Sequence, residues 1–212
     1  MTPAAAHSFV HQFVRATVKN AATLLLLHGT GGDERDLLPI GRALDPAAGL
    51  LSPRGRVLES GAPRFFRRLA EGVFDLEDLA VRTDELAEFV TAAAHHYGFD
   101  ESRVIAVGYS NGANIAASLL LRRPHVLAGA ILFRPMVPFE PATPPDLHRA
   151  RVFIGAGRRD PIVPPGQPPR LQQILMEAGA AVEMHWHPGG HELGEDDLQA
   201  AKGWLSAALE ER

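Results

Sequence analysis

Apolar and polar residues follow two patterns along this chain, and these patterns predict strands and helices that alternate. Some runs are apolar at nearly every position, which is typical of parallel strands buried on both faces. These expected inner strands lie at residues 23–27, 49–53, 103–108, 127–133 and 151–157. Residues 8–15 and 182–187 mix polar positions with β-branched or aromatic ones, so two further strands are expected there, the first at a sheet edge.

The segments between these runs carry apolar residues at helical spacing. Residues 76–97 form the longest such segment, and Gly98 follows where a C-terminal cap belongs. Asp36 is placed to cap an earlier helix that has Pro39 in its first turn. Further helices are expected at residues 114–123, 171–178 and about 195–209. The alternation predicts an α/β fold, with one domain over residues 1–212 and helices on both faces of a mostly parallel central sheet.

Composition narrows the classes of function. The 212 residues carry a formal net charge of −4, so nothing in the global charge favours a nucleic-acid partner or an anionic membrane surface. Cysteine is absent, which excludes disulfides and a cysteine nucleophile. The first residues lack a signal-peptide pattern, and no apolar run approaches the roughly 20 residues of a membrane span. We therefore expect a cytoplasmic protein.

The sequence GYSNG at residues 108–112 has the form G-x-S-x-G and joins an expected strand to an expected helix. This context is typical of a nucleophile elbow, where the serine backbone is strained and two glycines let strand and helix approach each other. Ser110 would then project over the sheet edge, near the positive end of the following helix. The alternative is a structural glycine-rich turn that contains a serine.

A serine hydroxyl needs a base within hydrogen-bond reach, and the elbow predicts the chain order serine, acid, histidine. Asp160 and His191 each follow an expected strand in that order. We predict that His191 moves the proton and that Asp160 holds the imidazole. Asp160 as a mere opener of an Asp-Pro turn is the alternative. By their positions, four other acids fit the role of the triad acid less well: Asp146, Glu177, Glu183 and Glu192.

The charged intermediate of acyl transfer needs fixed hydrogen-bond donors. We predict the backbone N–H of Asn111, directly after the serine, and that of Thr30, in the loop HGTGG that follows an early strand. The glycines around Thr30 would let this loop approach a substrate closely. A phosphate-binding loop is the alternative, but the chain has neither a P-loop lysine at the required spacing nor a G-x-G-x-x-G pattern. His28 is expected to be structural.

Two other clusters have competing interpretations. The sequence HWHPGGH at residues 185–191 could form a three-histidine zinc site. No motif supplies a carboxylate ligand at a spacing typical of a metal site, however, and His191 is already assigned as the base. No metal is therefore expected. Arg64, Phe65 and Phe66 lie in RFFRR, which we interpret as a loop near a pocket mouth where arginines meet an anionic part of a substrate. Core phenylalanines and plain surface charge are the alternatives.

Four motifs in order, LLLLHGTGGDERDL, GYSNGANIAASLL, GAGRRDPIVP and GGHEL, resemble the carboxylesterase/phospholipase branch of the α/β-hydrolase superfamily. Within that branch, the chain looks most similar to bacterial esterases associated with hydroquinone and catechol stress. The segment RFFRRLAEGVFDLEDL also fits the pattern of these esterases. Acyl-protein thioesterases are similar relatives, whereas dienelactone hydrolases share the fold but use a cysteine. The resemblance covers residues 24–205 and implies no cofactor. It also implies a triad of Ser110, Asp160 and His191 with an oxyanion hole at Thr30 and Asn111.

The segment between the strands that end near Phe133 and begin near Arg151 is short and proline-rich. A helical lid domain does not fit there, so an open site for small or short-chain esters is expected. The predicted function is a carboxylesterase that forms an acyl-enzyme on a small-molecule ester, and the sheet edges are compatible with a homodimer. The alternatives are a thioesterase, a small-ligand sensor with a vestigial triad, and a metal-dependent hydrolase.

Overall fold

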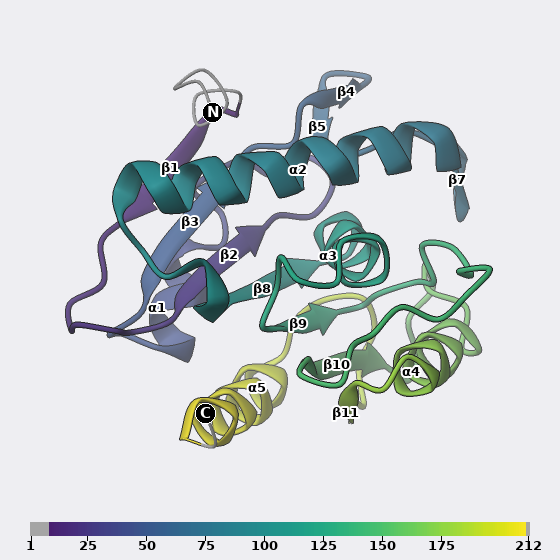
Figure 1. Ribbon diagram of the computed structural model, residues 1–212. Coiled ribbons are helices and arrows are strands. Elements are labelled where there is room, and N and C mark those ends of the chain that lie inside the picture. The colour runs from purple at the N-terminus through teal and green to yellow at the C-terminus, as the bar shows by residue number, and fades with distance from the viewer. Residues whose placement is uncertain (1–8, 211–212) are drawn as a thin grey trace.

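A computed structural model describes residues 9–210, and a seven-stranded sheet runs through its centre (Figure 1). Its strands are β1 His11–Val14, β2 Thr23–Leu27, β3 Gly49–Pro53, β8 Val104–Tyr109, β9 Gly129–Phe133, β10 Arg151–Gly157 and β11 Ala181–His187. They lie in the order β1-β3-β2-β8-β9-β10-β11. Only β1 is antiparallel to its neighbour in this sheet. The expected strands and the mostly parallel sheet are confirmed, although Ser8 of the first expected strand lies outside the described residues.

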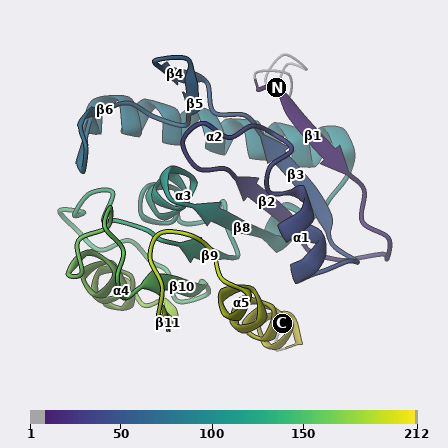
Figure 2. The same cartoon turned by 180° about the vertical axis from the view of Figure 1, so that it is seen from behind.

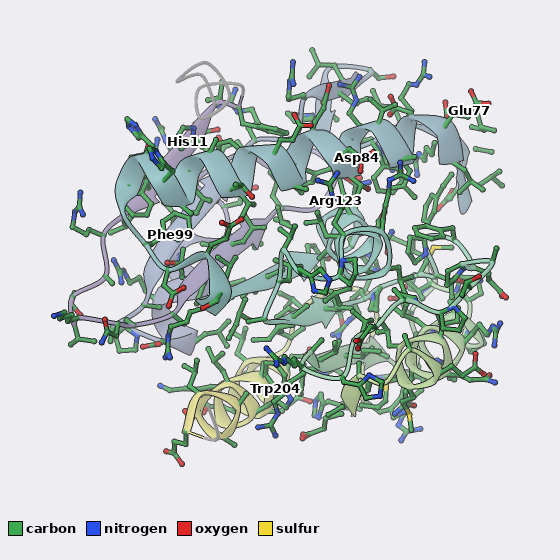
Figure 3. The ribbon with its side chains drawn as sticks, in the orientation of Figure 1. His11, Glu77, Asp84, Phe99, Arg123 and Trp204 are labelled. Atoms are coloured by element: carbon green, nitrogen blue, oxygen red, sulfur yellow. The ribbon has the colours of Figure 1, made fainter. Side chains whose placement is uncertain are left out.

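Helices cover both faces of the sheet. One face packs against α2 Leu76–Tyr97, α3 Asn111–Arg122 and α4 Gln167–Glu177. The other face packs against α1 Leu38–Leu44 and α5 Glu195–Glu210, which lie in front when the molecule is viewed from behind (Figure 2). Trp204 lies on α5 (Figure 3). Its ring centroid is 6.0 Å from that of Phe153 on β10, so α5 packs against the sheet here. Burial on both faces explains why β2, β3 and β9 are apolar almost throughout.

Helix ends follow the expected signals in one case and not in another. Gly98 ends α2 with a φ of 74°, a left-handed conformation that glycine adopts without strain. Asp36 does not cap α1, because the N-cap position is Leu37 and makes no side-chain hydrogen bond. The Asp36 carboxylate instead accepts a hydrogen bond from the Asp33 N–H at 3.1 Å. The prediction of an Asp36 cap was therefore wrong by one position.

Two small hairpins lie between β3 and α2, and the sequence pattern did not predict them. The first pairs β4 Val57–Glu59 with β5 Ala62–Arg64, and the second pairs β6 Arg68–Ala70 with β7 Val73–Phe74. Strands of two or three residues are too short to show a period. A short 3₁₀ helix, η1 Glu101–Arg103, precedes β8. Residues 135–150 contain no helix or strand, which agrees with the expected absence of a lid domain.

The direction of the connections changes between β2 and β8. From β2 the chain moves to β3 on one side, and from β8 it moves to β9 on the other. In open α/β sheets a crevice forms outside the carboxyl ends of the strands at such a switch point. The loops after β2 and β8 therefore meet there, with Leu27 and Gly108 paired across the two strands. No helix in the described part of the chain combines the length and the apolar character needed to cross a membrane.

Candidate active site

Ser110 occupies a strained turn between β8 and α3. Its φ is 53° and its ψ is −114°, a conformation that costs free energy for a residue with a side chain. The turn is held at both sides, because the Ser110 N–H donates to the Phe133 carbonyl at 2.9 Å and the Ser110 carbonyl accepts from the Asn114 N–H at 3.0 Å. Strand and helix thus fix the direction of the hydroxyl.

The two glycines of G-x-S-x-G are required by space. A Cβ on Gly108 would lie 2.5 Å from the Gly112 carbonyl oxygen. A Cβ on Gly112 would lie 1.9 Å from the Leu27 carbonyl oxygen, on the neighbouring strand β2. These distances are far below van der Waals contact with backbone atoms that cannot move aside. The sharp turn that presents Ser110 therefore depends on glycine at both positions.

One imidazole bridges the serine and an acid. The His191 Nε2 lies 3.0 Å from the Ser110 Oγ, and the His191 Nδ1 lies 2.8 Å from the Asp160 Oδ2. The loops after β8, β10 and β11 bring these residues together from sequence separations of 31 and 81. The Asp160 side chain is 2% exposed, whereas that of His191 is 16% exposed. The acid is shielded from water while the imidazole remains accessible.

Asp160 is both a turn residue and the partner of His191. Its Oδ1 accepts hydrogen bonds from the N–H groups of Ile162 at 2.8 Å and Val163 at 3.0 Å. Its Oδ2 stays available for the imidazole. The Asp-Pro turn and the triad interpretation are therefore compatible, because each uses a different oxygen.

The competing acids lie elsewhere. The Asp146 carboxylate is hydrogen-bonded to the His148 Nδ1 at 2.7 Å, in the connection between β9 and β10. Glu177 ends α4, Glu183 lies on β11, and the Glu192 carboxylate accepts from the Gly190 N–H at 2.9 Å. Within the described chain, Asp160 is the carboxylate hydrogen-bonded to His191.

The candidate oxyanion donors come from two neighbouring loops. Asn111 is the first residue of α3, so its backbone N–H has no acceptor within the helix. Thr30 lies in the loop after β2, where the N–H groups of Gly31 and Gly32 already donate to Pro63 and Gly29 carbonyls. The positive end of the α3 dipole also favours negative charge beside Ser110. This geometry suits the stabilisation of an anion.

The side chain of Asn111 has a structural role. Its Oδ1 accepts from the Phe65 N–H at 2.8 Å, which ties the start of α3 to the segment between β5 and β6. Its Nδ2 is buried and has no partner among the described residues.

Arg64, Phe65 and Phe66 do not form an exposed loop at a pocket mouth. Phe65 and Phe66 are 2% and 0% exposed and belong to the core on the α2 side of the sheet. Arg64 is 3% exposed, and its guanidinium donates to the Thr30 hydroxyl at 2.8 Å and the Phe66 carbonyl at 3.2 Å. Burial lowers the Arg64 pKa, and Glu59 lies 3.2 Å away as its counter-ion. Arg64 is therefore buried and holds the Thr30 side chain by a hydrogen bond, instead of facing solvent.

His28 is a buried structural residue. Its Nδ1 lies 2.6 Å from the Gly29 carbonyl, and its Nε2 accepts from the Gly55 N–H at 2.9 Å. This pair of bonds requires the neutral imidazole with the proton on Nδ1. Burial lowers the pKa of His28, which favours the same neutral form. The ring therefore fixes the loop that carries Thr30.

Arg134 is a site residue that the sequence analysis missed. It follows β9 with a φ of 56°, and its Nε and Nη2 donate to the carbonyls of Gly190 and Glu192 at 3.0 and 2.6 Å. These two carbonyls flank His191 on either side in the chain. Tyr109 adds a third contact, since its hydroxyl donates to the His191 carbonyl at 3.1 Å. The only sequence signal was a charged residue directly after a buried strand.

The three histidines of HWHPGGH do not converge on one point. His185 and His187 both turn toward Asp196, at 3.3 and 2.7 Å, whereas His191 turns toward Asp160. His187 does come close to the carboxylates of Asp196 and Asp197. Asp197 is, however, already paired with the Arg134 guanidinium at 2.6 Å. One of the three potential ligands is therefore already paired with an internal cation, and the other two are hydrogen-bonded to each other at 2.7 Å.

Comparison with known proteins places the chain among hydrolases. It is 51% identical over 199 residues to MhqD of Bacillus subtilis (strain 168), covering 94% of this chain and 98% of that protein. The crystal structure of the Bacillus cereus carboxylesterase superposes with a TM-score of 0.93 at 49% identity, covering 95% of each chain. A carboxylesterase from Mesorhizobium loti superposes with a TM-score of 0.88 at 33% identity, covering 93% of this chain and 94% of that one.

The family model that matches is that of the Dienelactone hydrolase family, over residues 59–202. The α/β-hydrolase fold and superfamily expected from the sequence are confirmed. The match includes the elbow, Asp160 and His191, and the chain has serine at position 110 and no cysteine. This chain belongs to the Dienelactone hydrolase family.

Proposed function

We propose that this protein is a serine hydrolase that cleaves carboxylic esters through an acyl-enzyme. The observation that carries the proposal is the position of the His191 imidazole, 3.0 Å from the Ser110 Oγ and 2.8 Å from the Asp160 carboxylate. A serine hydroxyl is a weak nucleophile unless a base removes its proton as it attacks. The similarity to two carboxylesterase structures supports an ester as the substrate.

In the first half-reaction the Ser110 Oγ attacks the ester carbonyl carbon and its proton moves to the His191 Nε2. Asp160 holds the Nδ1–H of the imidazole and stabilises the imidazolium that forms. The negative charge on the former carbonyl oxygen is met by the N–H groups of Thr30 and Asn111. The tetrahedral intermediate then collapses. The C–O bond to the alcohol breaks, the alcohol oxygen takes the proton from His191, and the acyl group remains on Ser110.

In the second half-reaction a water molecule takes the place of the alcohol. His191 removes a proton from the water, whose oxygen attacks the acyl carbon and forms a second tetrahedral intermediate. Collapse returns the proton to the Ser110 Oγ and releases the carboxylic acid. The absence of any helix or strand over residues 135–150 is consistent with an open site for small esters.

A fluorophosphonate probe tests the proposal, because rapid labelling requires an activated serine. We expect labelling of the wild-type protein, none of Ser110→Ala, and full labelling of Ser206→Ala, whose hydroxyl lies on the surface of α5. The Ser110→Ala change should reduce kcat on p-nitrophenyl acetate by about 10⁶-fold if the three residues act as a unit. An unlabelled wild-type protein would instead support a ligand sensor on a hydrolase fold.

A thioester would follow the same chemistry. Parallel assays with p-nitrophenyl acetate and an acetyl thioester of equal acyl length compare kcat/KM for the two classes. Carboxylesterase function predicts the larger value for the oxygen ester, after each is divided by its rate with hydroxide. Loss of activity with a chelator would contradict the serine mechanism and favour a metal-dependent hydrolase.

A further inference from the structure

A solvent-open pocket of about 380 Å³ lies between α1 and the loop that carries His191. Its apolar walls come from Leu37, Ile40, Tyr109 and Leu193, and we call it the Leu193 pocket. An apolar cavity of about 150 Å³ is large enough to hold benzene. The Leu193 pocket can therefore take a group of one ring or a short branched chain.

The wall of the Leu193 pocket includes residues that neighbour Ser110 and His191 in the sequence, together with Thr30. Thr30 belongs to its wall, Tyr109 directly precedes Ser110, and Leu193 follows His191 by two residues. The Tyr109 ring centre lies 5.4 Å from that of His191. In acyl transfer the imidazole must give its proton to the oxygen of the leaving alcohol. The alcohol therefore leaves on the imidazole side, and the pocket wall includes Glu192 and Leu193 of the loop that carries this imidazole.

The charges around the Leu193 pocket are of one sign. Asp36 and Glu192 line it, and no lysine, arginine or histidine of the described residues does. The hydrogen bond from the Gly190 N–H holds the pKa of Glu192 below its usual value, so this carboxylate stays ionised near neutral pH.

Two buried arginines contact residues of the pocket wall, and each is already paired with a carboxylate outside the pocket. Arg64 is paired with Glu59 at 3.2 Å and donates to the Thr30 hydroxyl at 2.8 Å. Arg134 is paired with Asp197 at 2.6 Å. Both arginines are at most 3% exposed. An anionic group placed in the pocket would therefore meet two carboxylates and no cationic side chain among the described residues that line it.

We propose that the Leu193 pocket binds the alcohol part of the substrate, that it selects uncharged apolar alcohols, and that Asp36 and Glu192 exclude alcohols bearing a carboxylate. This inference rests on the proposed esterase function. It replaces the expectation, drawn from RFFRR, that arginines receive an anionic part of the substrate. Asp36 and Glu192 are both exposed. Two like charges a few ångströms from an anion can together weaken its binding by about an order of magnitude even in water, where one pair about 4 Å apart costs about 1 kcal/mol.

The test compares two acetate esters that differ in charge and hardly in shape. They are 4-carbamoylphenyl acetate, which is neutral, and 4-carboxyphenyl acetate, which is an anion at pH 7. Each kcat/KM is divided by the rate of the same ester with hydroxide, so that leaving-group reactivity cancels. We expect the wild-type enzyme to favour the neutral ester by about tenfold at low salt, and less at high salt because exposed charges are screened.

Charge removal should narrow this preference. The double variant Asp36→Asn, Glu192→Gln keeps an acceptor oxygen for the N–H groups of Asp33 and Gly190 and should lower the preference to about twofold. The matched control Glu88→Gln, Glu177→Gln removes the same charge from the exposed surfaces of α2 and α4 and should leave the preference unchanged. An equal loss of preference in the control would show a global charge effect and overturn the assignment of Asp36 and Glu192.

A filling substitution tests the location. Ile40→Phe should reduce kcat/KM for phenyl acetate by at least about tenfold and leave methyl acetate within about twofold. Equal effects on both esters would contradict an alcohol site in the Leu193 pocket. If the wild-type enzyme labels at Ser110 but treats the neutral and anionic esters alike, the pocket inference fails and the esterase function stands. If Ser110 does not label and neither ester is cleaved, the proposed function itself fails.

Discussion

Arg134 and Asp197 form an ion pair with both side chains wholly buried beneath the loop that carries His191. The two guanidinium nitrogens lie 2.9 and 2.6 Å from the two carboxylate oxygens, and both side chains are 0% exposed. Asp197 also accepts from the Gly194 N–H at 2.9 Å, at the start of α5. The pair thus connects the end of β9, the His191 loop and α5 in one network.

Breaking this pair should be costly. Arg134→Met leaves the Asp197 carboxylate buried without its cation and should lower the free energy of unfolding by about 3–5 kcal/mol. The double variant Arg134→Met, Asp197→Leu removes both charges and should be more stable than Arg134→Met alone. Chemical denaturation measures both effects. As a control, Arg122→Met breaks an exposed pair with Asp84 and should cost at most about 1 kcal/mol. Equal costs for the two arginines would contradict the importance of burial.

Asp160→Asn separates orientation from folding. The amide can still accept the backbone N–H bonds of Ile162 and Val163 through its Oδ1. Its NH₂ group would face the His191 Nδ1 and favour the wrong tautomer, so kcat should fall by about 10⁴-fold while the unfolding midpoint stays nearly unchanged. Esterase kinetics and denaturation on the same preparation measure both. Retention of more than a tenth of wild-type kcat would reject the assigned role of Asp160.

Gly112 and Gly203 provide opposite outcomes for the same substitution. Gly112→Ala places a Cβ 1.9 Å from the Leu27 carbonyl oxygen and should destabilise the fold by about 3 kcal/mol or more. Gly203 lies on the exposed side of α5, and a Cβ there meets no atom within 4 Å. Gly203→Ala should therefore stabilise by about 0.5–1 kcal/mol. Thermal and chemical unfolding of the two variants test the predicted signs.

His28 predicts a loss of stability in mild acid. Burial lowers its pKa below the ordinary value of 6.5, so the unfolded chain binds the proton more readily than the folded one. The stabilisation from neutral His28 is complete above about pH 6.5 and is lost as the pH falls below that value. The unfolding midpoint should therefore decrease between pH 7.5 and 5.5.

The variant His28→Gln isolates this contribution. It should be less stable than the wild type at pH 7.5, because it loses the ring contact with Phe65 at 4.7 Å, but it should change less between the two pH values. His125→Gln, at an exposed position, should retain the wild-type pH dependence. The same decrease in His28→Gln as in the wild type would assign the acid sensitivity to other groups.

Local chemistry explains which parts of the site could be predicted. The elbow could be predicted because the strained turn at Ser110 requires glycine at positions 108 and 112. Both glycines lie within the same five consecutive residues as the serine, so the motif can be recognised in the sequence. Asp160 and His191 were visible because parallel strands deliver their following loops to one edge of the sheet. Two-residue and three-residue strands such as β7 and β4 were not visible, because they are shorter than the period that would identify them.

By itself, the sequence determined the order of strands and helices, the elbow and the residue types available for catalysis, because these depend on periodicity and on local steric limits. Only the tertiary structure decided what each charged or aromatic side chain meets. It buried Phe65 and Phe66, turned Arg64 toward Thr30, and paired Arg134 with Asp197 across 63 residues. Such pairings depend on how loops from distant strands pack together. The local sequence around an arginine therefore does not indicate whether its side chain will contact a substrate, solvent or a buried carboxylate.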